Sequence, residues 1–365
     1  MKLFIARSGE NLNIYFGIPS APQINHEEMD TSKRLVSALS NLPCHTRDFT
    51  TDDPYPFEAV SGTPSLIHAF NLSKAGIQCL KLANKARLPL IVSCSGLDVY
   101  ADLFNPALKH QLQDVISNAA RIIVPFAAMA KFIKTRLQPG ANIEVISPSV
   151  IPQSLDFDFP RQHFGLNDGD RIVMLEGGLL PVKNTIFAIH TIAKIISEYG
   201  NLKLVILADP CDKEYRLKIE DEISDKPWVT LLDRPEAELQ PFLYKMADLF
   251  INVSHVEGYN PSVLNAMLAG RPVLASDIPG NSAYVRNENI FEGSGTGYLY
   301  STSPGPEGYE KIHDAEEFIE KLRFLLNNPE QAKIVGERAE ITIKKSFNVQ
   351  KELYLHLQLY KNILK

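Results

Sequence analysis

Short apolar runs alternate with amphipathic segments along the whole chain, a pattern that predicts βαβ units and parallel sheets. In the first half, the apolar runs predict strands at 2–5, 12–16, 66–70, 88–93, 121–124 and 143–146. Segments with helical spacing predict helices at 26–42, 74–86, 107–119 and 128–137. These elements are sufficient for one doubly wound domain.

A stretch with several prolines and no periodicity, from Ser147 to Pro160, predicts a connector, after which the alternation begins again. The strands predicted in the second half are 171–175, 202–207, 228–232, 249–253 and 272–275. The predicted helices are 185–199, 214–223, 236–246 and 262–269, followed by a helical tail over 314–365 with breaks near Pro329 and Asn348. We therefore expect a second doubly wound domain in this half.

The sequence thus predicts an α/β fold of two doubly wound, Rossmann-like domains, 1–155 and 156–345. A helix at 346–365 is expected to cross back to the first domain. Ligands of doubly wound sheets bind outside the carboxyl ends of the strands, so two facing sheets predict one deep site in a central cleft. Proteins with many different functions have this architecture, so the architecture alone does not indicate which function this chain has.

Composition narrows the class of protein. The net charge of −6 argues against a nucleic-acid partner, which would favour a basic excess. The four cysteines are scattered without metal-ligand spacing, which predicts core residues rather than a metal site or disulfides. No signal peptide and no apolar segment of ~18 residues is evident, so we expect a cytoplasmic protein without a transmembrane segment. Peripheral membrane contact through the lysines of the tail is an alternative to a solvated helix face.

The stretch from Ser254 to Asn281 carries the most chemical information. A buried strand ends there in a turn that contains Glu257 and Gly258, and Pro261 suits the first position of the helix that follows. Backbone amides at such a helix start form an anion site, which predicts phosphate binding. The turn residues Tyr259 and Asn260 and the helix residues Ser262 and Asn265 are close enough in sequence to reach the same ligand.

This stretch resembles the donor-binding signature of the group 1, or family 4, retaining glycosyltransferases. That signature reads serine, two residues, Glu-Gly-Phe-Gly, a helix of small residues with a second Glu, Gly-x-Pro-Val-Val-Ala-Ser-Asp, and a Gly-Gly or Pro-Gly turn. Here the corresponding parts are Glu257-Gly-Tyr-Asn, Arg271-Pro-Val-Leu-Ala-Ser-Asp and Pro279-Gly. The resemblance implies the GT-B architecture, with Glu257 contacting the donor sugar.

A second segment, Gly177-Gly-Leu-Leu-Pro-Val-Lys183-Asn, resembles the Gly-Arg-Leu-x-x-x-Lys-Gly segment of the same family. The resemblance implies that Lys183 and the backbone amides of Gly177 and Gly178 bind the diphosphate of a nucleotide sugar. Two departures weaken the match. Gly178 replaces the family arginine, and Asn265 replaces the second acid, which contacts the ribose. Arg271 and Arg234 are candidate substitutes for that arginine, but nothing in the sequence places either of them beside the diphosphate.

The first half matches the family less well. Gly17 begins a segment that stands where the family has a Gly-Gly loop, and Ser93-Cys-Ser-Gly-Leu-Asp98 resembles the family segment Thr-x-His-Gly-x-Asp, with Ser95 at the His position. We expect Asp98 to be catalytic, with helix capping as its alternative role. Ser95 and His68 are expected on the acceptor side, although His68 closes an apolar strand and equally fits a core histidine.

Several of these residues also have simpler interpretations. Glu257 would otherwise be a solvated loop acid, Lys183 a solvated charge at a helix start, and Asn265 an amide on a helix face. His255 is expected to be only a neighbour of the motif. Tyr298 and Tyr300 are expected to pack within a strand, and neither is assigned to the site.

The function expected from the sequence is transfer of a sugar from a nucleotide diphosphate sugar, with a UDP-sugar favoured, retention of anomeric configuration, and no metal or other cofactor. The acceptor, whether glycan, lipid or small molecule, is unspecified. The two departures in the motif keep a second hypothesis open, a sugar-nucleotide-binding protein with weak or no turnover. An epimerase on the same architecture is a third. A phosphorylase is disfavoured, because the pyridoxal lysine context of that class is absent.

Overall fold

The computed structural model describes residues 12–18, 26–40, 44–50, 65–150, 160–208, 211–233, 239–288, 293–306 and 308–365. The chain forms two compact units. Unit 1 comprises Met1–Ser149 together with Val349–Lys365, and unit 2 comprises Val150–Asn348. The predicted strand at 2–5 and the predicted boundary at 155/156 lie outside the described residues.

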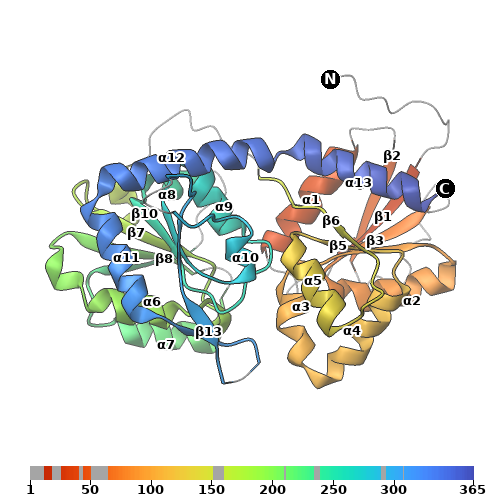
Figure 1. The fold of residues 1–365 in the computed structure, drawn as a ribbon, viewed down its shortest axis with the longest axis horizontal. Coiled ribbons are helices and arrows are strands. Elements are labelled where there is room, and N and C mark those ends of the chain that lie inside the picture. The colour runs from red at the N-terminus through yellow and green to blue at the C-terminus, as the bar shows by residue number, and fades with distance from the viewer. Residues whose placement is uncertain are drawn as a thin grey trace. The chain divides into compact units, whose positions relative to one another are not determined.

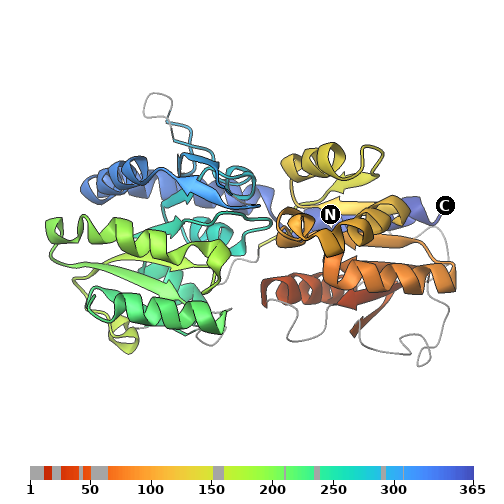
Figure 2. The same ribbon diagram turned by 90° about the horizontal axis from the view of Figure 1, so that it is seen from below.

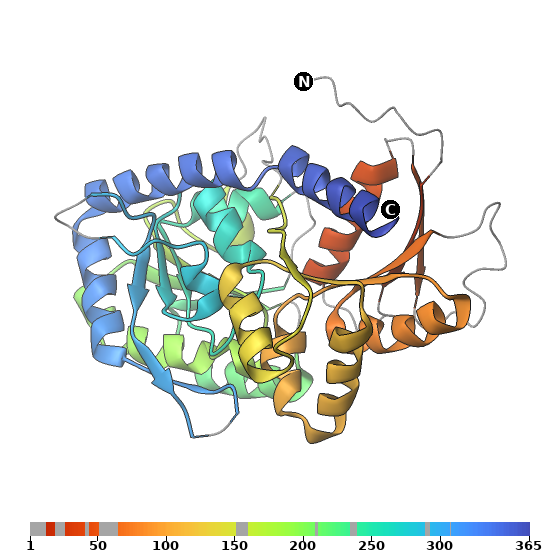
Figure 3. The ribbon, with the colours of Figure 1, turned by 45° about the vertical axis from the view of Figure 1, so that its right-hand side comes forward.

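Unit 1 is built on a parallel sheet with the order β2-β1-β3-β4-β5-β6 among the described strands. These strands are β1 Leu12–Ile18, β2 Cys44–Thr50, β3 Leu66–Phe70, β4 Leu90–Ser93, β5 Arg121–Val124 and β6 Ile143–Val145. The helices are α1 His26–Ser40, α2 Ile77–Ala86, α3 Leu97–Tyr100, α4 Pro106–Asn118 and α5 Ala127–Arg136. The C-terminal helix α13, Val349–Ile363, packs beside α1, and both cover the apolar core of the sheet (Figure 3).

Unit 1 differs from the predicted pattern at two places. Strand β2 was not predicted, because its sequence Cys44–Thr50 has no apolar run and it lies at the edge of the sheet. The helix predicted at 74–86 begins instead as a π-helix, Leu72–Gly76, which continues into α2. Asn71, at a φ of 83°, caps the π-helix by accepting the N–H groups of Ser73 and Lys74 at 3.1 and 2.8 Å.

Unit 2 contains a second parallel sheet, with the order β12-β11-β10-β7-β8-β9 in the part that is described. Its strands are β7 Arg171–Glu176, β8 Leu202–Leu207, β9 Val229–Leu232, β10 Leu249–Asn252, β11 Val273–Ser276 and β12 Tyr298–Tyr300. The helices are α6 Thr185–Ala193, α7 Lys213–Ile223, α8 Gln240–Met246, α9 Pro261–Leu268, α10 Pro279–Ser282, α11 Ala315–Asn327 and α12 Pro329–Ser346. Helices lie on both faces of this sheet (Figure 1), and α6 and α7 lie side by side on one of them (Figure 2).

The tail confirms its predicted breaks, since α11, α12 and α13 are separated at Asn328 and at Phe347–Asn348. Other predictions for unit 2 need correction. The helix predicted at 185–199 ends at Ala193 and is followed by a 3₁₀ turn, Ile196–Glu198. The short polar strands of the hairpin, β13 Thr302–Pro304 and β14 Lys311–His313, were missed because they contain no apolar run.

Among the three cysteines whose side chains the structure describes, two are core residues. Cys79 and Cys94 are buried as predicted, whereas Cys211 is exposed in the turn that precedes α7. The side chain of Cys44 lies outside the described part. Burial raises the pKa of the Cys79 thiol to about 12. The buried thiols therefore act as small apolar side chains rather than as reactive groups.

The strand order of unit 2 decides which loops meet. Strands β11, β10 and β7 are adjacent and parallel, so the loops after them emerge at the same edge of the sheet. These loops are 177–184 after β7, 253–260 after β10 and 277–278 after β11. Sequence segments up to about a hundred residues apart are thereby brought to one place, as expected at a ligand-binding edge of such a sheet.

Candidate functional site

The turn after β7 is made by two consecutive glycines with positive φ. Gly177 has a φ of 151° and Gly178 a φ of 80°. A Cβ on Gly177 would lie 3.2 Å from Cδ of Lys183, so the glycine lets the lysine stem pack against the backbone. Lys183 ends a short 3₁₀ helix, and Asn184, at a φ of 54°, then starts α6. The turn therefore directs the lysine ammonium toward the loop after β10.

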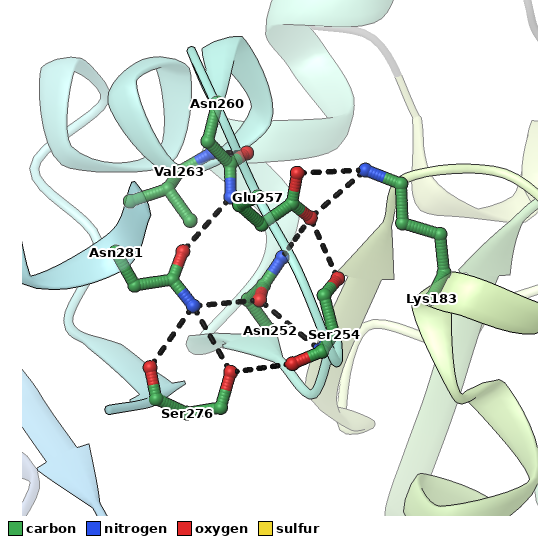
Figure 4. A network of polar contacts seen from close by, with 8 residues as sticks. All are labelled: Lys183, Asn252, Ser254, Glu257, Asn260, Val263, Ser276 and Asn281. Carbon is green, nitrogen blue, oxygen red and sulfur yellow. Dashed lines mark hydrogen bonds and ion pairs between the residues drawn. The ribbon is translucent and has the colours of Figure 1, made fainter. Parts of the chain in front are cut away.

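That ammonium forms a buried ion pair with Glu257 (Figure 4). Nζ of Lys183 lies 2.8 Å from Oε1 and 2.9 Å from Oε2 of Glu257. Lys183 is 8% exposed and Glu257 5% exposed, so each charge is almost fully withdrawn from water. A charge buried to this degree is tolerated only when it is paired and hydrogen-bonded. The two residues expected to carry the chemistry thus meet at one point in unit 2.

Two further side chains donate hydrogen bonds to Glu257. The Ser254 hydroxyl donates to Oε1 at 2.6 Å, and the Asn252 amide donates to Oε1 at 3.1 Å. Both residues come from the end of β10 and the turn after it. These donors fix the orientation of the carboxylate.

A layer of amides and hydroxyls supports this site from beneath (Figure 4). The Asn281 amide donates to Oδ1 of Asn252 at 2.9 Å and to the carbonyl of Ser276 at 3.1 Å. The Asn260 amide donates to Oδ1 of Asn281 at 3.0 Å, and the Ser276 hydroxyl donates to the carbonyl of Ser254 at 2.9 Å. The network joins the loops after β10 and β11 to the start of α9, which makes the Glu257 turn rigid.

Sequence reasoning missed four members of this network: Asn252, Ser254, Ser276 and Asn281. Asn281 lies in α10. The other three residues have a signal in the sequence, since each is a polar residue at or just after the end of an apolar strand. In parallel sheets this is where functional side chains gather.

The start of α9 differs in one detail from the expected anion site. Asn260 is the N-cap, and its Oδ1 accepts the N–H of Val263 at 3.2 Å, so part of the donor capacity of this helix end is used within the protein. Gly258 and Ser262 are buried, and Tyr259 is half-buried. The side chain of Asn265 is half-exposed and makes no hydrogen bond to any part of the chain that the structure describes.

Arg271 does not replace the family arginine that is absent at Gly178. It precedes β11 and so lies at the amino edge of the sheet, opposite the edge that carries Lys183. Its Nε donates to the carbonyl of Ala269 at 3.1 Å and its Nη1 to the carbonyl of Ala247 at 3.2 Å. Arg271 thus caps the ends of two helices. The other candidate, Arg234, lies outside the described residues.

The positive φ of Gly178 leads to a first prediction. Gly178→Ala places a side chain at a φ of 80°, which is expected to lower the free energy of unfolding by about 1–2 kcal/mol. Gly200→Ala is the control, because an added Cβ there meets no atom within 4 Å and no positive φ is involved. Urea denaturation followed by circular dichroism measures both. Equal stability of the two variants would show that the turn is not strained by a side chain.

Asp98 and Ser95 lie in unit 1, in the loop after β4. Oδ1 of Asp98 accepts the N–H of Gly96 at 2.7 Å, and Oδ2 accepts the N–H of Leu72 at 2.7 Å. Both oxygens also lie within 3.2 Å of the Ser95 N–H. Asp98 is 1% exposed. The carboxylate therefore ties the loops after β3 and β4 together, and it is not the N-cap of the next helix, because it lies inside α3, whose N-cap is Gly96.

His68 is a correction to the sequence analysis. The residue is 0% exposed, Nδ1 lies 2.8 Å from the Tyr360 hydroxyl, and Nε2 lies 2.8 Å from the Ser93 hydroxyl. Burial lowers the pKa of His68 well below its usual value, with His356 as the second cause. A fully buried imidazole with both nitrogens bonded has no contact to offer an acceptor, so His68 is a core residue that helps to dock α13.

Within the described ranges, no group of three or more His, Cys, Asp or Glu side chains is arranged to hold a metal ion. Among the helices of these ranges, none has both the length and the apolar character required to cross a bilayer.

Comparison with known proteins places this geometry in a family. Residues 156–342 match the family model described as glycosyl transferases group 1. Glycosyltransferase 1 domain-containing protein 1 of Xenopus tropicalis is 26% identical over 292 residues, which cover 76% of this chain and 79% of that protein.

Solved structures with the same fold cover nearly the whole chain. Sucrose-phosphate synthase of Thermosynechococcus elongatus has a TM-score of 0.73 at 17% identity, covering 96% of this chain and 98% of that one. Anabaena Alr3699/HepE, solved in complex with UDP-glucose, has a TM-score of 0.73 at 18% identity, covering 96% and 100% of the two chains.

Two parallel α/β units of this kind define a GT-B glycosyltransferase fold. The chain belongs to the glycosyl transferases group 1 family, whose model covers residues 156–342. The segments that hold Lys183 and Glu257 both lie inside the matched region. The transferase class expected from the sequence motifs is thereby confirmed.

Proposed function

We propose that this glycosyltransferase moves a sugar from a UDP-sugar to an acceptor hydroxyl, with retention of anomeric configuration and without a metal ion. The observation that carries the proposal is the buried Lys183–Glu257 pair at the carboxyl edge of the sheet in unit 2. An acid and a base held together away from water fit a ligand that carries both sugar hydroxyls and phosphates. The acid suits the hydroxyls and the ammonium suits the phosphates.

In this proposal Lys183 and the Gly177–Gly178 turn receive the diphosphate. The ammonium that pairs with Glu257 would then be shared with the phosphate oxygens. As the bond to the sugar breaks, negative charge grows on the leaving diphosphate, and a cation already fixed in place stabilises it without reorganisation. Because Gly178 replaces the family arginine, we expect slower turnover than in relatives that keep that arginine.

Glu257 is proposed to accept hydrogen bonds from hydroxyls of the donor sugar. Asn265 is proposed to bind the ribose through its amide, without the charge of an acid. Gly258, Tyr259, Asn260 and Ser262 would line the path between them, because they form the turn and the first residues of α9. The proposal for UDP rests on Alr3699/HepE, which has the same fold and was solved with UDP-glucose.

The acceptor is proposed to bind in unit 1, near the loops that Asp98 holds. Asp98 then acts as a positioning residue, since its oxygens accept backbone N–H groups of those loops. Ser95, whose hydroxyl lies 3.2 Å from Oδ1 of Asp98, would be the nearest side chain for an acceptor. Retention is proposed from the resemblance of the motifs to the retaining group 1 enzymes.

A panel of nucleotide sugars tests the proposal directly. Thermal shift and nucleotide release are measured with UDP-glucose, UDP-N-acetylglucosamine, GDP-mannose and ADP-glucose, with and without a mixture of sugar acceptors. A UDP-sugar at about 100 times its Kd is expected to stabilise the protein by about 2.7 kcal/mol. UDP release is expected to depend on acceptor. Glu257→Ala should lose both effects, whereas Glu214→Ala, at an exposed acid on α7, should keep them.

Each other outcome points to a different function. Binding of a UDP-sugar without release of UDP would favour a sugar-nucleotide-binding protein. The argument for that alternative is that Gly178 stands where the family has an arginine. Release that needs no acceptor and leaves a free sugar with changed stereochemistry would favour an epimerase. If a UDP-sugar stabilised the wild type and the Glu257→Ala variant equally, the assignment of the donor site to the Glu257 loop of unit 2 would be contradicted.

A further inference from the structure

A second cluster of hydrogen-bonded side chains lies beside the Glu257 loop and has no part in the proposed transfer. It contains Tyr300 of β12, His313 of β14 and His255 of the loop after β10. The Tyr300 hydroxyl lies 2.8 Å from Nδ1 of His313, and Nε2 of His313 lies 3.1 Å from Nδ1 of His255. The backbone N–H of Lys311 donates to the same Nδ1 of His255 at 3.1 Å.

The backbone donor fixes where the protons of this cluster lie. Because the Lys311 N–H can only donate, Nδ1 of His255 is an unprotonated acceptor and its hydrogen is on Nε2. His313 then donates from Nε2 to His255 and accepts the Tyr300 hydroxyl at Nδ1. Both imidazoles are neutral in this arrangement, and each hydrogen bond has one donor and one acceptor.

His255 connects three segments of unit 2. Its backbone N–H donates to the carbonyl of Val182 at 2.9 Å, which joins the Glu257 loop to the loop of Lys183. Its ring joins the same point to the β13–β14 hairpin through Lys311 and His313. The hairpin extends from the body of unit 2 (blue in Figure 3), and its strands pair only with each other. A two-stranded hairpin is marginally stable alone, so its side-chain attachments decide its position.

We infer that His255 is a positioning residue that, in its neutral form, holds the β13–β14 hairpin against the loops of Lys183 and Glu257. Only the kinetic test with UDP-glucose, described below, rests on the proposed function; the hydrogen-exchange test does not. Further side-chain attachments of the described hairpin strands are the Tyr300 hydroxyl on His313, the Phe187 ring at 5.0 Å from the His313 ring, and the Thr302 hydroxyl, which donates to the carbonyl of Asp277 at 3.0 Å. Asp277 lies in the loop after β11, whereas His255 also contacts the loop of Lys183, because its backbone N–H donates to the carbonyl of Val182.

Acid is expected to open this link. Protonation of Nδ1 turns His255 into a donor that faces the Lys311 N–H and the Nε2–H of His313. Burial lowers the pKa of His255, Glu310 raises it and the Lys311 ammonium lowers it. Burial lowers the pKa of His313 to about 3, with His255 and Lys311 as further causes. Since both values lie below the ordinary pKa, the link is complete above about pH 6.5 and is lost as the pH falls through the lowered values.

Hydrogen exchange in the full chain tests the inference without any ligand. His255→Leu removes the acceptor, whereas His255→Asn keeps an acceptor oxygen close to the position of Nδ1. Backbone amides of β13 and β14 are expected to exchange about tenfold faster in His255→Leu and within about twofold of the wild type in His255→Asn. Exchange as slow in His255→Leu as in the wild type overturns the inference, as does equal acceleration in both variants.

Kinetics with UDP-glucose then separates this role from the proposed function. His255→Leu is expected to raise the KM for UDP-glucose about tenfold with kcat changed less than about twofold, and His255→Asn to restore the KM. Wild-type protein that neither binds nor turns over any UDP-sugar would refute the proposed function, while the exchange experiment would still decide the role of His255. A KM that is the same in wild type and His255→Leu contradicts the role at the site.

Discussion

Lys183→Met is expected to lower kcat for UDP-sugar transfer by about 10²–10³, because it removes the cation that faces the leaving diphosphate. The same substitution leaves the Glu257 carboxylate buried without a counter-charge. Breaking a buried pair in this way costs about 3–5 kcal/mol. Steady-state kinetics and urea denaturation measure the two losses separately.

A double-mutant cycle with Glu257→Gln separates catalysis from stability. The carboxamide keeps the shape of the side chain and removes its charge, so the double variant should regain much of the stability that Lys183→Met loses while transfer stays lost. The exposed pair Lys218–Glu214 on α7 is the matched control, with 2.9 Å between Nζ and Oε1 but side chains that are 60% and 81% exposed. Its coupling is expected to be only about 0.3–0.5 kcal/mol. Equal coupling energies in the two cycles would contradict the buried geometry.

The central strands of both sheets could be predicted from the sequence because of how parallel sheets are buried. Strands covered on both faces read as continuous apolar runs. The boundaries expected for β3 Leu66–Phe70, β5 Arg121–Val124 and β8 Leu202–Leu207 are therefore confirmed to the residue. Strand β2 is the edge strand of its sheet, the β13–β14 hairpin forms a separate two-stranded sheet, and nothing in their composition distinguishes them from loops.

Some residues of the candidate site could likewise be predicted from the sequence, and others could not. A family resemblance points to Lys183 and Glu257, and the strand order explains why residues 74 apart in sequence share an ion pair. Sequence reasoning misassigned His68 for a physical reason. The residue lies in the middle of β3, Leu66–Phe70, rather than at a strand end, and its partner Tyr360 lies 292 residues further along, on the helix α13 that belongs to unit 1. A contact between residues so far apart in the sequence cannot be predicted from the local pattern of apolar and polar residues.

Gly280→Ala is expected to damage the site as severely as loss of a charged residue, although it adds only a methyl group. A Cβ on Gly280 would lie 2.3 Å from the carbonyl oxygen of Glu257, 2.5 Å from its carbonyl carbon and 2.6 Å from its Cβ. The atoms that it meets are backbone or next to backbone, so no side-chain rotation relieves the clash and the Glu257 turn must move. Overpacking of this kind costs about 1–3 kcal/mol, and displacement of a reacting group by about 1 Å costs about 10²-fold in rate.

Gly336→Ala is the matched control for this substitution. A Cβ on Gly336, in α12, would lie 2.2 Å from the carbonyl oxygen of Gly270, so its clash is equally close but falls at the end of α9 that is remote from Glu257. Both variants are expected to melt at lower temperature than the wild type, and Gly280→Ala alone should lose transfer activity beyond what its unfolded fraction explains. Activity per folded molecule, measured well below both melting temperatures, makes the comparison. If the two variants lost the same activity, close packing of Gly280 against the Glu257 turn would have no special role in the site.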